Sequence, residues 1–366
     1  MAIKGYEIKP KYATPPGNTL EEVLKDRLMT KAELSDRIGL TPKTISNIIS
    51  GKAPITPETA SKLELVLGVP STFWNNLELR YREGIEEKRK EEEYEKQLDF
   101  IKTVPYSEMA KVGLVPKTRN SIEKISNLLS FFSCASVEIL TQKLNDSSLL
   151  EGAYRGSTVA EVDRIALYGW IRQGEIKAQT IQTKEFDRNI AKKSLVLLRE
   201  LTNETNPDIF IPEIQKICSN FGVAVVFVPE VKGSRVCGLT RWLTPYPKAI
   251  IQLSLRYKTN DHLWFTFFHE LSHIILHNKQ PFYTFNREYQ DSSDEKEANE
   301  YAANILIKEL DFEEFIESNR ISKDSVLMFA KSQEIHPGIV VGRLQKRGII
   351  AWNQMNDLKI RYQWDI

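Results

Sequence analysis

The sequence predicts a mainly helical α+β protein with a small β-sheet. Three observations lead to this fold class: short helices with frequent stop signals, a highly charged run after them, and three strand-like apolar runs followed by long helical patterns. A chain of 366 residues also exceeds the usual size of one domain. We therefore expect an N-terminal domain at residues 1–83, a helical connecting region at 84–202 and a C-terminal domain at 203–366.

The N-terminal domain is expected to contain five short helices between residues 19 and 80. Glycines and Thr-Pro pairs separate the apolar helical patterns, as at Gly39, Thr41-Pro42, Gly51, Thr56-Pro57 and Gly68-Val69-Pro70. From residue 83 to 96 the sequence EGIEEKRKEEEYEK is almost wholly charged, which is typical of a solvated connecting helix. We place the end of the domain there.

Residues 31–38 and 41–49 have the proportions of two helices joined by a short turn. Thr41 is a suitable N-cap before Pro42, and the polar side of the second helix suits base edges and phosphates in the major groove. The same hairpin is also compatible with a packing module that has an ordinary polar face. The candidate DNA-binding residues are Lys31, Thr41, Lys43, Thr44, Ser46, Asn47 and Lys52.

The rest of the chain divides into a helical part and a mixed part. Amphipathic patterns at 122–129, 159–172 and 187–201 predict helices but bring together no chemical constellation. Apolar runs at 223–228, 236–243 and 249–253 predict three strands of a small sheet. Two long helices are expected at about 261–277 and 293–310.

The first of these long helices carries the pentad His269-Glu270-Leu271-Ser272-His273. Histidines at i and i+4 project from one side of a helix, near enough to share one Zn²⁺. Glu270 lies one step round the helix, where it can act as general base on a water activated by the metal. A glutamate in so apolar a helix is costly without a partner, which argues against a chance match. We therefore expect zinc as the cofactor.

A catalytic zinc needs a third protein ligand, and Glu297 is our candidate. It lies on the second long helix, where Ala298, Ala302 and Ala303 would allow close packing against the first.

Three other residues are weaker candidates for this third position. Glu295 and Glu300 are expected to point away from the Glu297 side and to be solvated. His277 continues the i, i+4 series, but three ligands along one helix lie nearly on a line. Alternatively, His277 is a cation at the C-terminus of the helix, or a residue that contacts a metal ligand without binding the metal itself.

Two resemblances add to these predictions. Residues 16–81, above all GKAPITPETA and FWNNLELRY, resemble the HigA-type branch of the XRE helix-turn-helix family. This resemblance implies an antitoxin or autorepressor that binds a palindromic operator in double-stranded DNA as a homodimer, with Lys43, Thr44 and Asn47 at the base-reading positions. A proline stands where the family commonly has a histidine before Pro-Gly.

From about Gly222 the chain resembles the ImmA/IrrE family of metallopeptidase-like proteins, through VAVVFVPEVKGSRVCGLTRWL, IIQLSLRYKTNDHLWFTFFHELSHIILH and EKEANEYAANILI. The resemblance implies a minimal gluzincin-like fold with zinc held by His269, His273 and Glu297 and with Glu270 as the base. It also implies a protein substrate bound along a sheet edge, for which residues 236–242 are the candidate. Lys308 departs from the proline that commonly ends the last motif.

Composition limits the remaining function classes. A formal net charge of +1 gives no global attraction for polyanions, so a nucleic-acid surface must be local. Scattered cysteines and the lack of a long apolar segment predict a cytoplasmic protein without a membrane span: Cys134, Cys218 and Cys237 form no CxxC pair.

These observations leave two hypotheses open. In the first, a DNA-binding transcriptional regulator carries a zinc-dependent endopeptidase that cleaves a protein partner or itself. In the second, the protein is a non-catalytic antitoxin that binds a toxin and its own operator, and its metal site is structural or sensory.

Overall fold

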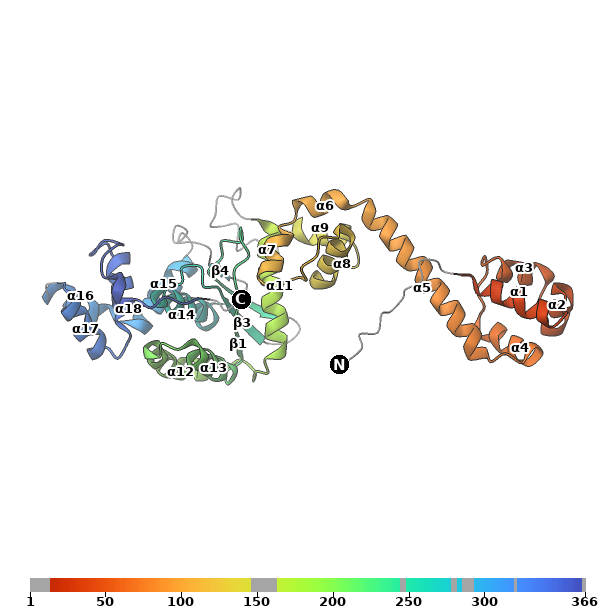
Figure 1. Cartoon of the computed structure of the whole chain (residues 1–366). Coiled ribbons are helices and arrows are strands. Elements are labelled where there is room, and N and C mark those ends of the chain that lie inside the picture. The colour runs from red at the N-terminus through yellow and green to blue at the C-terminus, as the bar shows by residue number, and fades with distance from the viewer. Residues whose placement is uncertain are drawn as a thin grey trace, which may run out of the picture. The chain divides into compact units, whose positions relative to one another are not determined.

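The computed structural model describes residues 14–145, 163–243, 248–277, 282–284, 293–318 and 321–363 (Figure 1). The chain forms two compact units, Met1–Leu98 and Asp99–Ile366. Helices dominate both, and a small sheet lies in the second, so the predicted fold class is confirmed. None of the helices in the described ranges is both long and apolar enough to span a membrane.

Unit 1 contains the five expected helices. Threonines cap three of them: Thr30, Thr41 and Thr56 each accept a hydrogen bond from the backbone N–H three residues later. Leu34, Ile45 and Trp74 lie in the buried core of the unit. The helices are α1 (Pro16–Asp26), α2 (Lys31–Ile38), α3 (Pro42–Ile49), α4 (Pro57–Leu67) and α5 (Ser71–Glu95).

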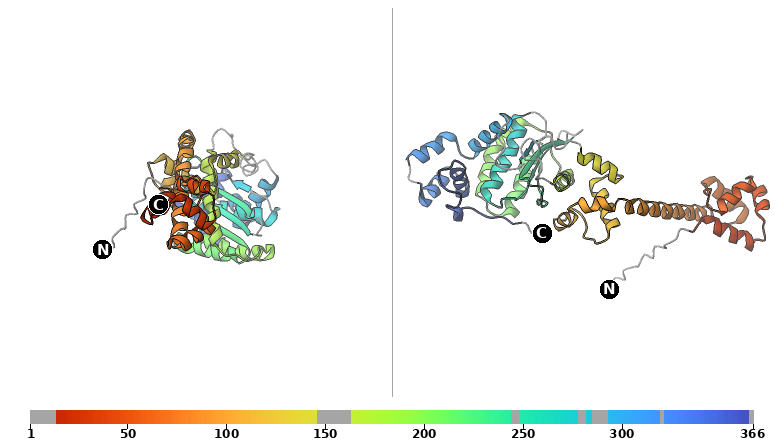
Figure 2. Two further views of the ribbon diagram at one scale, coloured as in Figure 1. Left: turned by 90° about the vertical axis from the view of Figure 1, so that its right-hand side faces the viewer. Right: turned by 90° about the horizontal axis from the view of Figure 1, so that it is seen from above.

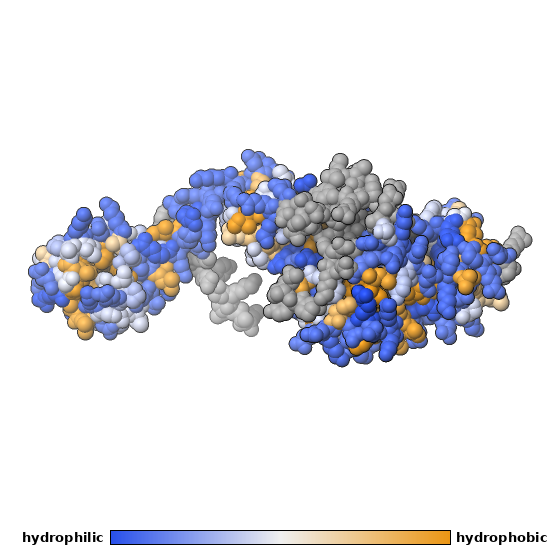
Figure 3. All heavy atoms as spheres, turned by 180° about the vertical axis from the view of Figure 1, so that it is seen from behind, coloured by the Kyte–Doolittle hydropathy of each residue, from blue (hydrophilic) through white to orange (hydrophobic). Residues whose placement is uncertain are grey.

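The charged run at 83–96 continues α5 rather than forming a separate element, and the right-hand view of Figure 2 shows this long helix. Its surface is largely hydrophilic in Figure 3. The expected role of this run as a solvated helix therefore agrees with the structure. The compact units, however, divide after Leu98, whereas the sequence placed boundaries near 83 and 202.

Unit 2 consists of one sheet surrounded by helices. The elements before the sheet are α6 (Leu98–Thr103), α7 (Tyr106–Lys111), α8 (Ser121–Phe132), α9 (Val137–Asn145), α11 (Arg164–Thr180), α12 (Arg188–Glu200), η3 (Leu201–Asn203) and α13 (Pro207–Ser219). Those after its third strand are α14 (Asn260–Leu276), α15 (Ser293–Leu306), α16 (Glu309–Ser318), α17 (Lys323–Ser332), α18 (Pro337–Lys346) and η4 (Asn356–Leu358).

The sheet has the strand order β1-β3-β2-β4. Its strands are β1 (Val223–Phe227), β2 (Gly238–Leu243), β3 (Lys248–Leu253) and β4 (Phe282–Thr284). β1 is parallel to β3, whereas β2 is antiparallel to both β3 and β4. The three expected strands are present, and β4 is an addition. Because β4 pairs with residues 238–240, the expectation that residues 236–242 form a free sheet edge is wrong over that stretch.

Alternate side chains of the strands face two different layers. Val225 and Ile251, which are register partners, belong to the main hydrophobic core together with residues of α13 and α14. On the other face, Gln252 Nε2 donates a hydrogen bond of 2.7 Å to the carbonyl oxygen of Trp170 in α11. Figure 1 shows α11 beside β1 and β3. Residues 164–180 of the expected connecting region therefore form one layer of unit 2.

Candidate metal centre and helix-turn-helix surface

The HExxH pentad lies in the middle of α14, which packs against the sheet, α15 and α18. Apolar residues on several sides of this helix enter the core, among them Phe267, Phe268 and Leu271. The pentad is consequently buried: His269 is 2% exposed, Glu270 0% and His273 1%. Imidazole and carboxylate groups at such depth require polar partners.

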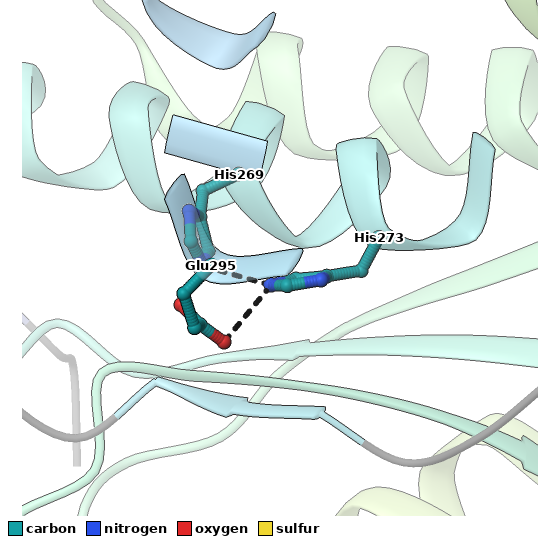
Figure 4. A group of neighbouring side chains, drawn as sticks. All are labelled: His269, His273 and Glu295. Carbon is teal, nitrogen blue, oxygen red and sulfur yellow. Dashed lines mark hydrogen bonds and ion pairs between the residues drawn. The ribbon is translucent and has the colours of Figure 1, made fainter. Parts of the chain in front are cut away.

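For the Nε2 atoms of the two histidines, those partners come from within the pentad and from α15. The Nε2 atoms of His269 and His273 lie 3.0 Å apart. The carboxylate of Glu295 lies 3.2 Å from His269 Nε2 and 3.3 Å from His273 Nε2. Figure 4 shows the three side chains pointing toward one another from the two helices. Two nitrogen donors and one carboxylate therefore converge on a single point.

The separations fit a divalent metal ion. A tetrahedral zinc ion with bonds of roughly 2.0 to 2.1 Å holds its ligand atoms about 3.3 Å apart. The three separations in this cluster lie between 3.0 and 3.3 Å. Two imidazoles and one carboxylate are also a ligand set that zinc enzymes use. His269, His273 and Glu295 are thus the residues in the described part of the chain that would hold such an ion.

The structure corrects the sequence-based placement of the acidic residues. Glu295, expected to be solvated, has a side chain only 21% exposed and contacts both histidines. Glu297, our candidate for the third ligand, is 61% exposed at its side chain and contacts His277 instead, at 3.3 Å. The reason is the phase of α15. Ala298 and Ala302 are buried, and Glu295 precedes them by three and seven residues, on the same helix face.

The electrostatics of the cluster follow from burial and mutual contact. Burial would raise the pKa of Glu295, but its hydrogen bonds with the two histidines lower it to about 2. Burial lowers the pKa of His273 to about 4, although Glu295 opposes this shift. Burial also opposes protonation of His269, yet Glu295 and Glu270 outweigh it and raise the pKa of that residue. The carboxylate is therefore ionised and ready to bind a cation.

Glu270 is held from the side of β2. Thr240 Oγ1 donates a hydrogen bond of 2.9 Å to the backbone carbonyl of Glu270. The side chain of Glu270 occupies space beside Gly238. Its negative charge acts on His269, which places it close to the cluster. The predicted base thus lies next to His269, one of the predicted ligands.

The candidate DNA-binding residues lie around the start of α3. Thr41 Oγ1 accepts a hydrogen bond from the N–H of Thr44 at 3.1 Å and lies 2.9 Å from Thr44 Oγ1, so both hydroxyls serve the helix cap. Lys31 forms an ion pair of 2.9 Å with Glu21. Thr44 and Asn47 are half-buried, and the exposed members of the set are Lys31, Thr41, Lys43, Ser46 and Lys52.

Comparison with known proteins gives two family matches. The helix-turn-helix family matches residues 20–74. The HTH-type transcriptional regulator YddM of Escherichia coli is 35% identical over 63 residues, which are 17% of this chain and 67% of that protein. The chain belongs to the HTH-type transcriptional regulators. In this regulator a second family, the IrrE N-terminal-like domain, matches residues 218–335. That match covers β1 to α17 and includes the whole HExxH cluster.

Two solved structures resemble part of this regulator. An addiction module antidote protein of a HigA family from Coxiella burnetii is 27% identical, covering 23% of this chain and 92% of that one, with a TM-score of 0.21. PA4674 of Pseudomonas aeruginosa, solved in complex with its operator DNA, is 23% identical, covering 20% and 81%, with a TM-score of 0.20.

Proposed function

We propose that this regulator binds operator DNA through unit 1 and is a zinc-dependent endopeptidase through unit 2, cleaving a protein partner or itself. One observation carries the peptidase proposal: His269, His273 and Glu295 converge to within 3.3 Å of one another beside Glu270. A purely structural helix has no need for three buried ionisable groups next to a fourth that is largely buried, because each is costly to desolvate.

The chemistry proposed is hydrolysis of a peptide bond. Zinc, when bound, would act as a Lewis acid. It would polarise the carbonyl of the peptide bond to be cleaved and lower the pKa of the attacking water toward about 7. Glu270 then acts as general base and takes a proton from the water as its oxygen bonds to the carbonyl carbon. The same carboxylic acid returns the proton to the amide nitrogen when the C–N bond breaks. Glu270 thus ends the cycle as the carboxylate it was at the start.

The DNA-binding proposal is supported by the exposed surface of α3. Lys43 and Ser46 are exposed on α3, Asn47 is half-buried beside them, and Lys52 is exposed in the turn after the helix. Short polar side chains of this kind read base edges, while the lysines hold phosphates. We propose binding as a homodimer, because paired copies of such a helix read the two halves of a palindromic operator. Lys31 contributes less, since Glu21 already neutralises it.

The test of the peptidase proposal compares three purified proteins and the cells that produce them. The wild type, Glu270→Gln and His269→Ala are assayed for bound zinc by elemental analysis. New protein N-termini in the cells are then identified by mass spectrometry. We expect zinc in the wild type and in Glu270→Gln, loss of zinc in His269→Ala, and new N-termini only with the wild type. Glu300→Gln, an exposed change on α15, is the matched control.

The result also decides between the two hypotheses. If Glu270→Gln yields the same new N-termini as the wild type, the cleavage belongs to another protease. If the wild type yields none while promoter control is intact in all variants, the protein is a non-catalytic regulator. Absence of zinc from the wild type would refute the metal site itself.

A further inference from the structure

We propose that His277 and Glu297 form a hydrogen-bonded relay that orients His273 and fixes which of its nitrogens faces the metal. The inference rests on the proposed metal site and assigns a role to two residues outside it. His273 Nδ1 lies 2.9 Å from His277 Nδ1, and His277 Nε2 lies 3.3 Å from Glu297 Oε2. The two contacts form a continuous path from the proposed ligand to a carboxylate on α15.

The direction of the hydrogen bonds follows from the chemistry of imidazole. His273 directs Nε2 toward His269 and Glu295. Nε2 is therefore the atom that would bind the metal, and it must be unprotonated to do so. The proton of the neutral ring is then on Nδ1, which donates to His277 Nδ1. His277 must in turn hold its proton on Nε2, which donates to the carboxylate of Glu297. This arrangement of protons satisfies the contacts His273–His277 and His277–Glu297, and it leaves Nε2 of His273 unprotonated, as a metal ligand must be.

The backbone supports the same geometry. His277 is the C-cap of α14, with an extended backbone conformation, and its N–H donates to the carbonyl of His273 at 3.1 Å. His277 is therefore held to His273 through both its backbone and its ring. Its side chain is only 6% exposed, so the contact between the rings is shielded from water. A shielded hydrogen bond holds a ring more firmly than one that competes with solvent.

The relay also gives a physical reason for two glutamates at positions 295 and 297. Residues two apart on a helix lie roughly 200° apart around its axis. Glu295 contacts His273 at Nε2, whereas Glu297 reaches the Nδ1 side of the same ring through His277. α15 thus holds His273 from both sides. Removal of a residue that hydrogen-bonds to a metal ligand commonly weakens metal affinity by about 10- to 100-fold.

The test measures zinc affinity of the full-length protein by competition with a chelator, which does not depend on catalysis. We expect His277→Ala to weaken zinc binding by about 10- to 100-fold. His277→Asn keeps an acceptor near the position of Nδ1 and should recover part of that loss. Glu297→Gln should cost only a few-fold, because the amide oxygen still accepts a hydrogen bond. Glu295→Gln should abolish binding, and Glu300→Gln should have no effect.

A second measurement reports the protons directly. Long-range nitrogen–proton NMR correlations of the zinc-loaded protein should show His273 protonated at Nδ1 and His277 at Nε2. A His277 ring protonated at Nδ1 alone would overturn the relay, because it could not accept from His273.

The outcomes separate this inference from the proposed function. If the wild type binds no zinc, the metal site fails and the relay with it. If the wild type binds zinc and His277→Ala binds it equally well, only the relay fails. If Glu297→Gln is as damaging as Glu295→Gln, Glu297 is a ligand and the relay is wrong. If His277→Ala does not fold, the exposed change Glu297→Ala, with a smaller expected loss of affinity, decides the matter.

Discussion

The carboxylate of Glu270 lies against Gly238 so closely that a Cβ atom at position 238 would come within 2.5 Å of Glu270 Oε1. The same Cβ would lie 2.7 Å from Thr266 Cγ2. Both neighbours belong to α14, one helical turn apart. The shape of β2 at this point therefore determines where the proposed base can lie.

Gly238→Ala should displace the Glu270 carboxylate without touching the ligands. We expect peptide cleavage to fall by about 10²-fold, within the range that general-base catalysis contributes, while bound zinc is unchanged. Thr240→Val is the comparison on the same strand: it removes the hydrogen bond to the Glu270 carbonyl and should cost about 1 kcal/mol of stability. Full cleavage by Gly238→Ala would show that the position of the carboxylate is not critical.

We propose that Lys43 contacts a phosphate rather than a base edge, the role that the family resemblance implied. Lys43→Ala should therefore weaken operator binding equally for all sequences, because a phosphate contact carries no sequence information. The slope of log affinity against log salt should decrease by about one. Asn47→Ala should instead relax specificity, at about 1 to 3 kcal/mol for the base it reads. The measurement is fluorescence anisotropy with a DNA fragment that the wild type selects from a random pool. If the double variant Lys43→Ala, Asn47→Ala binds operator DNA as well as the wild type, the helical hairpin is a packing module.

Lys359→Met should destabilise unit 2, because Lys359 and Asp261 form an ion pair in which each side chain is 6% exposed. The lysine Nζ donates to Asp261 at 2.6 Å and to Gln345 at 2.7 Å. Removing one member leaves a buried, uncompensated charge, at about 3 to 5 kcal/mol. The double variant Asp261→Asn, Lys359→Met should be less destabilised. Urea unfolding measures both, and equal losses would contradict the account.

Stability should also decrease in mild acid through His336, the N-cap of α18. Its Nδ1 accepts a hydrogen bond from the N–H of Gly338 at 3.1 Å and lies 2.8 Å from Asn260 Nδ2. Burial lowers the pKa of His336 in the folded protein. The unfolded chain therefore binds the proton first, and stability is complete above pH about 6.5 and falls below it.

The variant His336→Asn keeps a capping side chain that does not titrate in this range. Its melting temperature should fall less than that of the wild type between pH 7 and pH 5.5. Parallel curves for the two proteins would exclude His336 as the source of acid sensitivity.

Much of this architecture could be predicted because it depends on local signals. The Thr-Pro pairs and glycines of unit 1 start and end helices within a few residues, so the five helices could be predicted, and all five are present. The apolar runs before α14 likewise identified three strands. β4 could not be predicted, since a three-residue strand owes its existence to pairing with β2. The role of α11 was missed for the same reason, because Trp170 and Gln252 meet only in the folded chain.

The identity of the proposed third ligand was predicted wrongly from the sequence, although the signal for it was present. Glu295 and Glu297 lie on the same helix, and the choice between them depends on which face of α15 meets α14. Ala298 and Ala302 indicate that face, and both are fully buried. The spacing from Glu295 to these alanines, three and seven residues, already matched a helix face. The contact of Glu297 with His277 had no comparable signal, because it depends on the extended conformation at the end of α14.

The position of α11 across the sheet has a practical consequence for how the protein can be divided. A fragment that begins at residue 203, where the sequence placed a domain boundary, would expose Val226 and Ile250 to water and leave Gln252 without its bond to Trp170. An uncovered apolar sheet face of this kind invites self-association. A proteolytic fragment that behaves as a well-dispersed monomer should therefore start near Asp99.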